Sequence, residues 1–535
     1  MTNSYITTPI YYVNDAPHIG HAYTSVMCDI LARLKRLNGQ NVKFLTGTDE
    51  HGQKVEKSAI KNGKTPQEFC DEVSQKFRDL AKFLNISNDD FIRTTENRHK
   101  KTAQIFWKKL EENGWIYKGK YEGWYAVRDE AFYDEKELVD GKAPTGAEVE
   151  WHKEESYFFK LSEFQDILLK IYDEFEGFIS PISKKNEVVS FVKGGKEYEK
   201  GALKDLSISR TSFKWGVKVP ENESHIMYVW LDALTNYLSA LEYPDSKNCH
   251  DFWKLANVTH IVGKDILRFH CVYWPAFLIA SKFKKDEIAN LEIDDVKDIL
   301  PTKIFAHGWW TNDGQKISKS VGNVIDPIKE IEWLQNDFGI DEDLAIDYFR
   351  YFMAKEVHFG NDGDYSKERF VERINSELAN NIGNLAQRSL SMIFKNNEGK
   401  LLEKDNIDDE GKDLIGFVKE SFLDFSFEIE DCEFDEILTN IISSASKANE
   451  YFDKKAPWNL KKEGKLDEMN QVLYVVAEVV RMLAISLLAF VPKSANKILD
   501  LLNVEEEKRN FSAIEDSLNF GAKINEPKPV FLRLT

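Results

Sequence analysis

The sequence predicts an α/β fold in which a parallel sheet is split by an inserted subdomain and followed by an all-α bundle. Residues 1–115 alternate short β-prone runs with helical apolar patterns, and the same alternation returns over residues 226–325. The segment between them, residues 116–225, has short aromatic strands and charged turns instead. Beyond about residue 366 the strand patterns end and amphipathic helical patterns take over. Alternating strands and helices are typical of a parallel sheet, and successive amphipathic helices of a bundle.

The composition is ordinary for a globular protein of several domains. The chain has 535 residues, of which 42% are hydrophobic and 30% charged, and about two to four domains are expected. It has no apolar run near the roughly 18 residues of a membrane span and no secretory signal. Five scattered cysteines without a CxxC pair argue against a disulfide framework and favour a reducing cytoplasm. The net charge of −19 disfavours indiscriminate nucleic-acid binding but allows a partner that meets a local basic face.

The first half supplies a βαβ unit. Its predicted elements are a strand over Tyr5–Val13, a helix over Ala22–Leu37, a strand over Asn41–Leu45, and helices over Thr65–Leu84 and Asn97–Asn113. Apolar residues at helical spacing predict the first helix, and Asn38-Gly39 ends it. Ligands bind at the carboxyl ends of parallel strands, so Tyr12 and Asp49 are expected in a binding site.

Two histidines stand where the first strand leads into the first helix. His18 and His21 are three residues apart, which places them on one face of a first helical turn. Gly20 between them leaves the backbone open to a flat ring. With the positive end of a helix dipole, these residues suit a polyphosphate and adenine. Taken alone, such a pair is equally an incidental feature of a surface turn.

The inserted subdomain is predicted from aromatic runs. Short strands are expected over residues 121–125, 148–151 and 157–159. The polar, lysine-rich stretch Lys184–Lys200 is expected to be exposed.

Two aromatic stripes mark the second half. Its predicted elements are a helix after Tyr228, a strand over Val258–Val262 with the exit turn Gly263–Asp265, a second helix, and a strand over Lys303–Gly308. On the first helix, Trp230, Ala233 and Tyr237 share a face (i, i+3, i+7). On the second, Ile266, His270 and Trp274 form another (i, i+4, i+8). Without further context, such stripes are equally consistent with plain core.

A basic loop follows the last strand. Lys316 and Lys319 flank Ser318 in a turn bounded by Gly314 and Gly322. A mobile cationic loop suits the neutralisation of charge on a transferring phosphate, although two lysines alone are also typical of a solvated loop. Beyond it, helices are predicted over residues 370–396, 409–425, 433–452 and 466–502, with a break or start at Pro457.

The two motifs together resemble those of a known enzyme class. His18-Ile19-Gly20-His21 and Lys316-Ile317-Ser318-Lys319-Ser320 resemble the HIGH and KMSKS motifs of class I aminoacyl-tRNA synthetases. The first match is complete, and the second departs only by Ile317 in place of methionine. Within this class the chain resembles the methionyl-tRNA synthetase family over nearly its whole length. The matching stretches are Thr8–Tyr12, Thr46–Gly52, Asp205–Arg210, Tyr228–Leu234, Ile261–His270, Phe305–Trp310, Asn381–Leu385 and Ala456–Trp458.

The resemblance implies a two-step reaction. Methionine attacks ATP to give methionyl-adenylate and pyrophosphate, and the terminal ribose of tRNA(Met), initiator tRNA included, then takes the methionyl group. It also implies a division into a Rossmann-type catalytic domain (1–115 and 226–325), an inserted connective subdomain (116–225), a stem-contact linker (326–365) and an α-helical anticodon-binding domain (366–535).

The resemblance further implies roles for individual residues. The catalytic set is His18, His21, Lys316 and Lys319, and the ATP-binding set adds Gly20, Gly263, Asp265 and Ser318. The methionine pocket is Ile10, Tyr12, Asp49, Trp230, Ala233, Leu234, Tyr237, Ile266, His270 and Trp274. His270 is equally explained as a satisfied core histidine. The anticodon readers are Asn384, Arg388 and Trp458, for which bundle surface and bundle core are the alternatives.

The departures from the family pattern carry further expectations. Ala126 stands where many relatives begin a cysteine zinc knuckle, so no structural zinc is expected. Mg²⁺ is expected to enter with ATP. The chain stops at Thr535 without the appended tRNA-binding module that makes some relatives dimeric, so a monomer is expected. The scattered cysteines and the lack of a long apolar run lead us to expect a cytoplasmic protein with no membrane contact.

Three other functions remain as alternatives. Another class I synthetase would need an editing insertion or zinc cysteines that are missing, and a small-molecule nucleotidyltransferase would not need the bundle. A non-catalytic tRNA-binding paralogue would not need His18, His21, Lys316 and Lys319. Methionine-dependent exchange between ATP and pyrophosphate separates all of these.

Overall fold

The computed structural model describes most of the chain. The described residues are 2–13, 16–128, 131–133, 135–312, 314–317, 323–402, 406–423 and 425–535.

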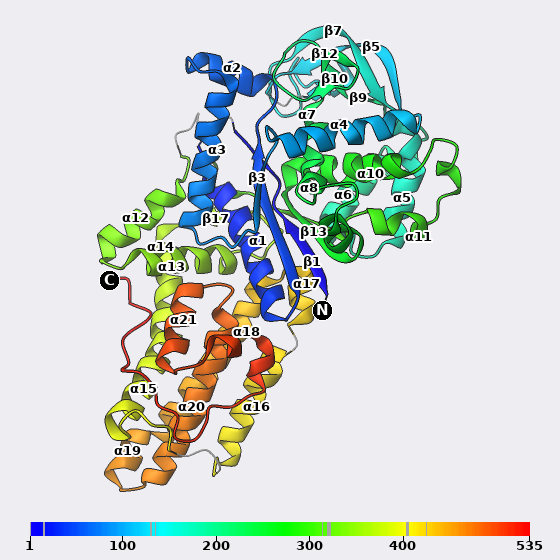
Figure 1. The fold of residues 1–535 in the computed structure, drawn as a ribbon. Helices are drawn as coiled ribbons and strands as arrows, with labels where there is room; N and C mark the ends of the chain where they lie inside the picture. Colours follow the sequence, from blue (N-terminus) through cyan, green and yellow to red (C-terminus); the bar gives the residue numbers. More distant parts are fainter. Residues whose placement is uncertain are drawn as a thin grey trace.

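A parallel sheet forms the centre of the molecule (Figure 1). Its strands are β1 (Asn3–Thr7), β2 (Tyr11–Tyr12), β3 (Asn41–Asp49), β4 (Asp90–Arg93), β8 (Ile179–Ser180), β13 (Ala256–Gly263) and β14 (Lys303–His307). They run in the order β2-β3-β1-β13-β14-β8, with β4 also paired to β3. The two halves of the sequence meet where β1 pairs with β13, with Tyr5 opposite Val258. The predicted split sheet is thus confirmed.

Four helices accompany the first half. They are α1 (Ile19–Leu37), α2 (Gln53–Lys61), α3 (Pro66–Phe83) and α4 (Asn97–Glu112). α3 begins with a capping box between Thr65 and Glu68 and has Pro66 in its first turn, where the missing N–H has no intrahelical partner. α1 begins three residues earlier than predicted, so that His21 lies inside its first turn.

The inserted segment builds two antiparallel sheets. One contains β5 (Ile116–Ala126), β6 (Ala131–Tyr133), β7 (Glu150–Phe159) and β9 (Leu206–Ser207), and the other β10 (Ser209–Arg210), β11 (Lys218–Val219) and β12 (Asn222–Met227). The strands predicted over 148–151 and 157–159 are two ends of one strand, because β7 pairs with β5 along its whole length. Pairing along a partner strand keeps the charged residues between them extended.

The expectation for Lys184–Lys200 was wrong in part. α5 (Gln165–Glu174) leads into β8, which pairs with β14, and α6 (Ile182–Lys193) follows directly. Val188 and Val192 of α6 are buried in the core of the catalytic domain. Two apolar residues four apart are enough to bury one stripe of a helix whose other faces carry lysines.

Short helices make up most of the second half of the catalytic domain and of the segment that follows it. They are α7 (Val229–Leu234), α8 (Asn236–Ser239), α9 (Lys247–Cys249), α10 (Trp274–Lys282), α11 (Ile293–Val296), α12 (Pro327–Phe338) and α13 (Glu342–Lys355). A third small sheet joins β15 (Trp310–Asn312), β16 (Gln315–Lys316) and β17 (Gly363–Tyr365). Single 3₁₀ turns occupy Glu135–Glu137, Leu161–Phe164, Lys264–Ile266, Ile288–Asn290, Lys297–Ile299, Glu506–Lys508 and Phe511–Ile514, and π-helical turns His250–Lys254, Phe269–Tyr273 and Ile374–Gly383.

The C-terminal part is an α-helical bundle, as predicted. Its helices are α14 (Lys367–Arg373), α15 (Asn384–Asn396), α16 (Asp409–Leu423), α17 (Ser426–Asp431), α18 (Phe434–Lys455), α19 (Pro457–Lys462), α20 (Leu466–Leu487) and α21 (Pro492–Leu501). The single helix predicted over 466–502 is two, because Pro492 lacks an N–H and starts α21. Of the described helices, only α20 is long and apolar enough to cross a membrane by composition, and 94% of its apolar window is buried in the bundle.

The bundle packs directly on the sheet domain beside α1 (Figure 1). Val26 and Leu34 of α1 share one apolar core with Phe352 of α13 and Leu483 of α20. Within the same interface, the buried guanidinium of Arg350 lies 2.7 Å from the carboxylate of Asp29. The bundle therefore packs directly against α1, the helix whose N-terminus carries the two histidines.

Candidate active site

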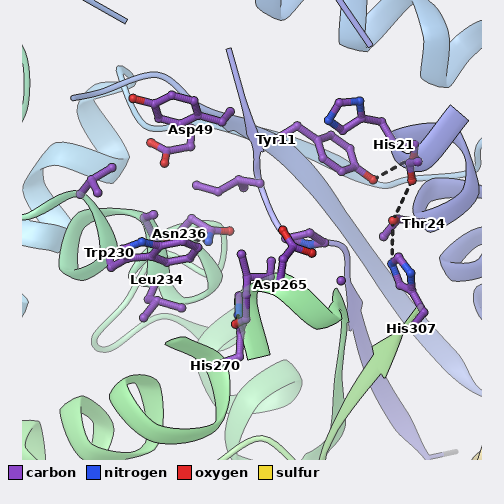
Figure 2. A pocket seen from close by; sticks show the side chains of 18 of the residues that line it. Tyr11, His21, Thr24, Asp49, Trp230, Leu234, Asn236, Asp265, His270 and His307 are labelled. Carbon is purple, nitrogen blue, oxygen red and sulfur yellow. Dashed lines mark hydrogen bonds between the residues drawn. The ribbon is translucent and has the colours of Figure 1, made fainter. Parts of the chain in front are cut away.

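The carboxyl ends of the central strands open into one cavity of about 440 Å³ (Figure 2). β3 ends at Asp49, β13 at Gly263 and β14 at His307, and all three residues line the cavity. It lies at the seam between the two halves, where ligands bind in open parallel sheets. The lining residues that the sequence predicted are Ile10, Tyr12, His18, Gly20, His21, Asp49, Trp230, Ala233, Leu234, Tyr237, Gly263, Asp265, Ile266 and His270.

The two motif histidines cap α1 with their own side chains. Nδ1 of His18 accepts a hydrogen bond from the N–H of Gly20 at 3.1 Å, and Nδ1 of His21 accepts one from the N–H of His18 at 3.1 Å. The backbone of His18 is extended, as is usual for the residue that precedes a helix. A capping box normally uses a hydroxyl and a carboxyl group, and here two imidazoles take both places.

This capping fixes the protonation of both rings. A ring nitrogen that accepts a hydrogen bond carries no proton, so each neutral imidazole has its N–H at Nε2. Burial lowers the pKa of His18, and burial together with the neighbouring ring lowers the pKa of His21 well below its ordinary value. The first turn of α1 therefore offers two neutral N–H donors, 4.0 Å apart between ring centroids, rather than two cations.

A different chemistry lines the other end of the cavity. Asp49, which is 7% exposed, stands beside Tyr12 because β2 pairs with the end of β3. The indole of Trp230 stacks on Phe269 with a centroid distance of 3.7 Å and an interplanar angle of 5°. One carboxylate beside aromatic walls suits a small ligand with a cationic group and an apolar, polarizable side chain.

His270 is locked in place by two hydrogen bonds. Its Nδ1–H donates to the carbonyl of Ile266 at 3.0 Å, because a carbonyl can only accept. Nε2 therefore accepts from the hydroxyl of Tyr237 at 2.7 Å. Burial lowers the pKa of His270 to about 4, so the ring is neutral. The residue is a fully bonded buried histidine and it also lines the cavity.

Comparison with known proteins agrees with this geometry. The family described as tRNA synthetases class I (M) matches residues 4–150 and 144–390, and the anticodon binding domain of methionyl tRNA ligase matches residues 403–535. The methionine–tRNA ligase of Rickettsia conorii is 54% identical over 539 residues, which cover 99% of each protein. The chain belongs to the class I methionyl-tRNA synthetase family. The predicted family, fold and activity, methionine–tRNA ligase, are thereby confirmed.

Other members of the methionyl-tRNA synthetase family show the same extent of similarity. The Brucella suis enzyme is 48% identical over 535 residues, covering 99% of this chain and 97% of the relative. The structure of Mycobacterium tuberculosis methionyl-tRNA synthetase in complex with methionyl-adenylate has a TM-score of 0.90 and 42% sequence identity, with 100% of both chains covered.

One predicted pocket residue of the synthetase lies outside the cavity lining. Trp274 is fully buried, its ring centroid is 5.9 Å from that of Tyr237, and its indole N–H donates to Nε2 of His260 at 3.3 Å. The spacing that grouped it with Ile266 and His270 assumes an α-helix throughout. A π-helical turn over Phe269–Tyr273 intervenes, so the 3.6-residue period does not hold there.

The lysine loop is described only in part. The backbone of Lys316 lies in β16, which pairs antiparallel with β15. The side chain of Lys316, and Ser318 and Lys319 altogether, lie outside the described residues. The N–H of Gly314 donates to the carboxylate of Asp364 at 2.8 Å, which ties the start of this loop to β17.

Several residues that line the cavity are not among the predicted site residues. These residues are Pro9, Tyr11, Thr24, Lys54, Arg128, Val229, Asn236, His307 and Trp309. His307 could have been found by the rule that singled out Asp49, because it ends a parallel strand. Arg128 could not, because it reaches the cavity from the inserted segment, far from the other lining residues in sequence. Lys54 lies 5.2 Å from the ring of Tyr12, and with Arg128 it adds cationic side chains to the lining.

The three predicted anticodon readers belong to α15 and α19, which lie at the end of the bundle farthest from the sheet (Figure 1). The guanidinium of Arg388 on α15 lies 5.1 Å from the ring of Trp458 on α19 and 2.8 Å from the carboxylate of Asp453. Asn384 is exposed one turn earlier on α15. An exposed amide, an arginine and a half-buried indole form a surface on which unstacked bases can bind.

Within the described ranges, no group of three histidine, cysteine, aspartate or glutamate side chains is arranged to hold a metal ion. The cysteines are all buried thiols. The stretch after Ala126, for which no zinc knuckle is predicted, includes residues 129, 130 and 134, which the structure does not describe.

Proposed function

We propose that the cavity at the seam of the sheet joins L-methionine to ATP and then passes the methionyl group to the 3′ end of tRNA(Met), for both initiation and elongation. One observation carries this proposal: the capped histidine pair and the Asp49–aromatic end line a single cavity. A 42% identical relative whose structure holds methionyl-adenylate supports it.

The nucleotide is assigned to the α1 end of the cavity. The Nε2–H groups of His18 and His21 donate to phosphate oxygens of ATP, and adenine packs over the bare backbone of Gly20. Gly263 and Asp265, at the end of β13, bind the ribose. Lys316, Ser318 and Lys319 enclose the departing pyrophosphate, and Mg²⁺ enters as MgATP. Support comes from the helix N-terminus, whose dipole favours anions, and from the Nε2–H groups that the capping rings leave available there.

Methionine is assigned to the opposite end. Asp49 accepts hydrogen bonds from the ammonium group, and the thioether packs among aromatic rings, which sulfur contacts favourably. The proposed pocket comprises Ile10, Tyr12, Asp49, Trp230, Ala233, Leu234, Tyr237, Ile266 and His270 as lining residues, with Trp274 as a buried support behind Tyr237.

The chemistry needs positioning rather than a covalent nucleophile. A methionine carboxylate oxygen attacks the α-phosphorus of ATP, the bond from that phosphorus to the bridging oxygen breaks, and pyrophosphate leaves with the electron pair. Negative charge builds on oxygens around the phosphorus, where preorganised N–H donors stabilise it most. A ribose hydroxyl of the tRNA terminus then attacks the adenylate carbonyl and AMP leaves.

The test of this proposal is ATP–pyrophosphate exchange with each amino acid in turn, followed by charging of tRNA(Met). Exchange that is by far the most efficient with methionine, and methionyl-tRNA as product, are expected. More efficient exchange with a different amino acid would contradict the assignment of the pocket. No exchange at all, with tRNA still bound, would leave a non-catalytic tRNA-binding protein.

Substituting Gly20 tests the adenine and His18 assignments. A Cβ atom at Gly20 would lie 3.0 Å from Cε1 and 3.2 Å from Nδ1 of His18, so Gly20→Ala should displace that ring. We expect the KM for ATP to rise about tenfold, as for loss of one charged hydrogen bond. Stability should change little, because alanine favours a helix by about 1 kcal/mol and a lost cap costs about as much.

The matched control is Gly416→Ala, a helical glycine in α16 whose added Cβ meets no atom within 4 Å. Its expected result is an unchanged KM for ATP. An unchanged KM in Gly20→Ala as well would contradict the placement of ATP over this turn.

Anticodon reading is assigned to Asn384, Arg388 and Trp458. Base–aromatic stacking contributes about 1–3 kcal/mol per base, so Trp458→Ala should raise the KM for tRNA(Met) roughly 10- to 100-fold. Methionine-dependent exchange, which needs no tRNA, should stay near its original rate. Phe427→Ala is the control, because Phe427 is a 75% exposed aromatic residue elsewhere in the bundle. Equal losses of charging and exchange in Trp458→Ala would contradict the assignment.

The remaining proposals concern organisation and metal content. The proposed division has its boundaries at residues 115, 225, 325 and 365. The first boundary is supported by β5, which starts at Ile116, whereas β8, inside the proposed insert, already pairs with β14 of the central sheet. A cytoplasmic monomer without membrane contact, and the absence of structural zinc, complete the proposal. Elemental analysis of purified protein should find well under one zinc per chain, and a stoichiometric value would contradict this.

A further inference from the structure

A buried carboxylate lies behind the amino-acid end of the cavity. Asp232 is 0% exposed, and each of its oxygens contacts a different histidine ring. Oδ2 lies 2.6 Å from Nδ1 of His51, and Oδ1 lies 2.6 Å from Nε2 of His99. The other nitrogen of His99 lies 3.1 Å from the hydroxyl of Ser239. We call Asp232, His51, His99 and Ser239 the carboxylate cluster.

Hydrogen-bond accounting fixes how this cluster is protonated. Burial alone would raise the pKa of Asp232, but the two histidines outweigh it and hold that pKa well below its ordinary value. An ionised carboxylate only accepts, so both facing nitrogens, Nδ1 of His51 and Nε2 of His99, must carry protons. Each bond has a charged acceptor, which makes it short and directional.

Three members of the cluster are close neighbours in sequence of residues that line the methionine end of the cavity. His51 follows Asp49 by two residues, Asp232 lies between Trp230 and Ala233, and Ser239 follows Tyr237 by two residues. His99 belongs to α4, which packs against α8 and α10. A single carboxylate thus joins the turn after β3 to the α7–α8 segment. Asp49 and Trp230, each two residues from a member of the cluster, line the cavity (Figure 2).

We propose that Asp232 is a positioning residue for methionine, which sets the separation of Asp49 from Trp230 and Tyr237 through its bonds to His51 and His99. This inference rests on the proposed function, because it assigns those three residues to the methionine pocket. The ammonium group and the thioether side chain are bound at opposite walls, so both contacts hold only at one wall separation. No atom of Asp232 needs to touch the substrate.

A role in core stability alone makes a different prediction. Loss of packing would lower the melting temperature and the active fraction, which reduces kcat for every substrate without changing KM. A change in the separation of Asp49 from Trp230 and Tyr237 would instead raise the KM for methionine. The KM for ATP would stay unchanged, because ATP binds at the α1 end. The two KM values in one exchange assay therefore separate the two roles.

The variant Asp232→Asn is the direct test. Asparagine has nearly the same shape, but its NH₂ group faces one of the two ring N–H groups, so one of these bonds is lost and two donors oppose each other. We expect the KM for methionine to rise at least about tenfold, the size of one hydrogen bond to a charged group. The KM for ATP should stay within about twofold.

A matched control is Asp347→Asn in the bundle. Asp347 is also 0% exposed, and it accepts from the N–H of Ser494 at 2.6 Å, far from the cavity. Its variant should leave both KM values unchanged, whatever it does to stability. Equal changes of the methionine KM in the two variants would overturn the proposal.

A second pair of variants keeps the test informative if Asp232→Asn folds poorly. His99→Gln retains an N–H close to the position of Nε2, whereas His99→Leu removes it. We expect the KM for methionine to stay within about threefold in the first and to rise as in Asp232→Asn in the second. Identical methionine KM values in the two would overturn the proposal. Absence of methionine-dependent exchange in the unaltered protein would instead overturn the proposed function itself.

Discussion

Replacing His21 with asparagine is expected to slow methionine-dependent pyrophosphate exchange about 10²- to 10³-fold, the usual effect of removing one preorganised donor from a site of developing charge. The amide oxygen of asparagine can take the place of Nδ1 and accept from the N–H of His18, so the cap of α1 is kept. The donor at Nε2 is lost. The measurement is kcat for exchange at saturating ATP and methionine, with thermal unfolding as the check on folding.

His21→Gln is the complementary variant. Its amide nitrogen can reach the position of Nε2, but no group replaces the Nδ1 acceptor, so the cap is lost. We expect a smaller loss of kcat than in His21→Asn and a lower melting temperature. If His21→Gln loses more kcat than His21→Asn, the ring acts through the cap and not as a donor to phosphate.

Replacing Asp49 with asparagine is expected to raise the KM for methionine about 10²-fold or more, because it leaves a substrate ammonium without its charged partner in a buried site. The side chain keeps its shape, so the pairing of β2 with β3 that positions it beside Tyr12 should persist. The KM for ATP and the melting temperature should change little.

The control for Asp49→Asn is an exchange assay with alanine as a second amino-acid substrate. Alanine lacks the thioether but keeps the ammonium, so any residual exchange with alanine should fall by the same factor as exchange with methionine. If only the methionine KM rises, Asp49 contacts the side chain rather than the ammonium group, and the assigned orientation of the substrate is wrong.

Much of the candidate site follows from local sequence. The spacing of His18 and His21 predicts one face of a first helical turn, and α1 starts at Ile19 with both rings in its cap. The position of Asp49 after a short apolar strand predicts the carboxyl edge of a sheet, and the end of β3 lies at the cavity. Helical spacing grouped Trp230, Ala233 and Tyr237, and all three line the cavity.

Contacts distant in sequence account for what could not be predicted. β7 is one strand because β5 pairs with all of it, although its own sequence reads as two runs. α6 buries Val188 and Val192 because β8 carries it to the edge of the central sheet. Arg128 joins the cavity only because the inserted sheets bring its turn there.

The sequence by itself determined the fold class, the family and the residue types at both ends of the cavity, because helical period, strand ends and short motifs are local properties of the chain. Only the tertiary structure decided that the two imidazoles are neutral, that Trp274 stands behind Tyr237 and that Asp232 holds two histidines. The physical reason is that protonation and side-chain direction depend on burial and hydrogen-bond partners. Those partners come from segments up to 181 residues apart in the chain, as between His51 and Asp232.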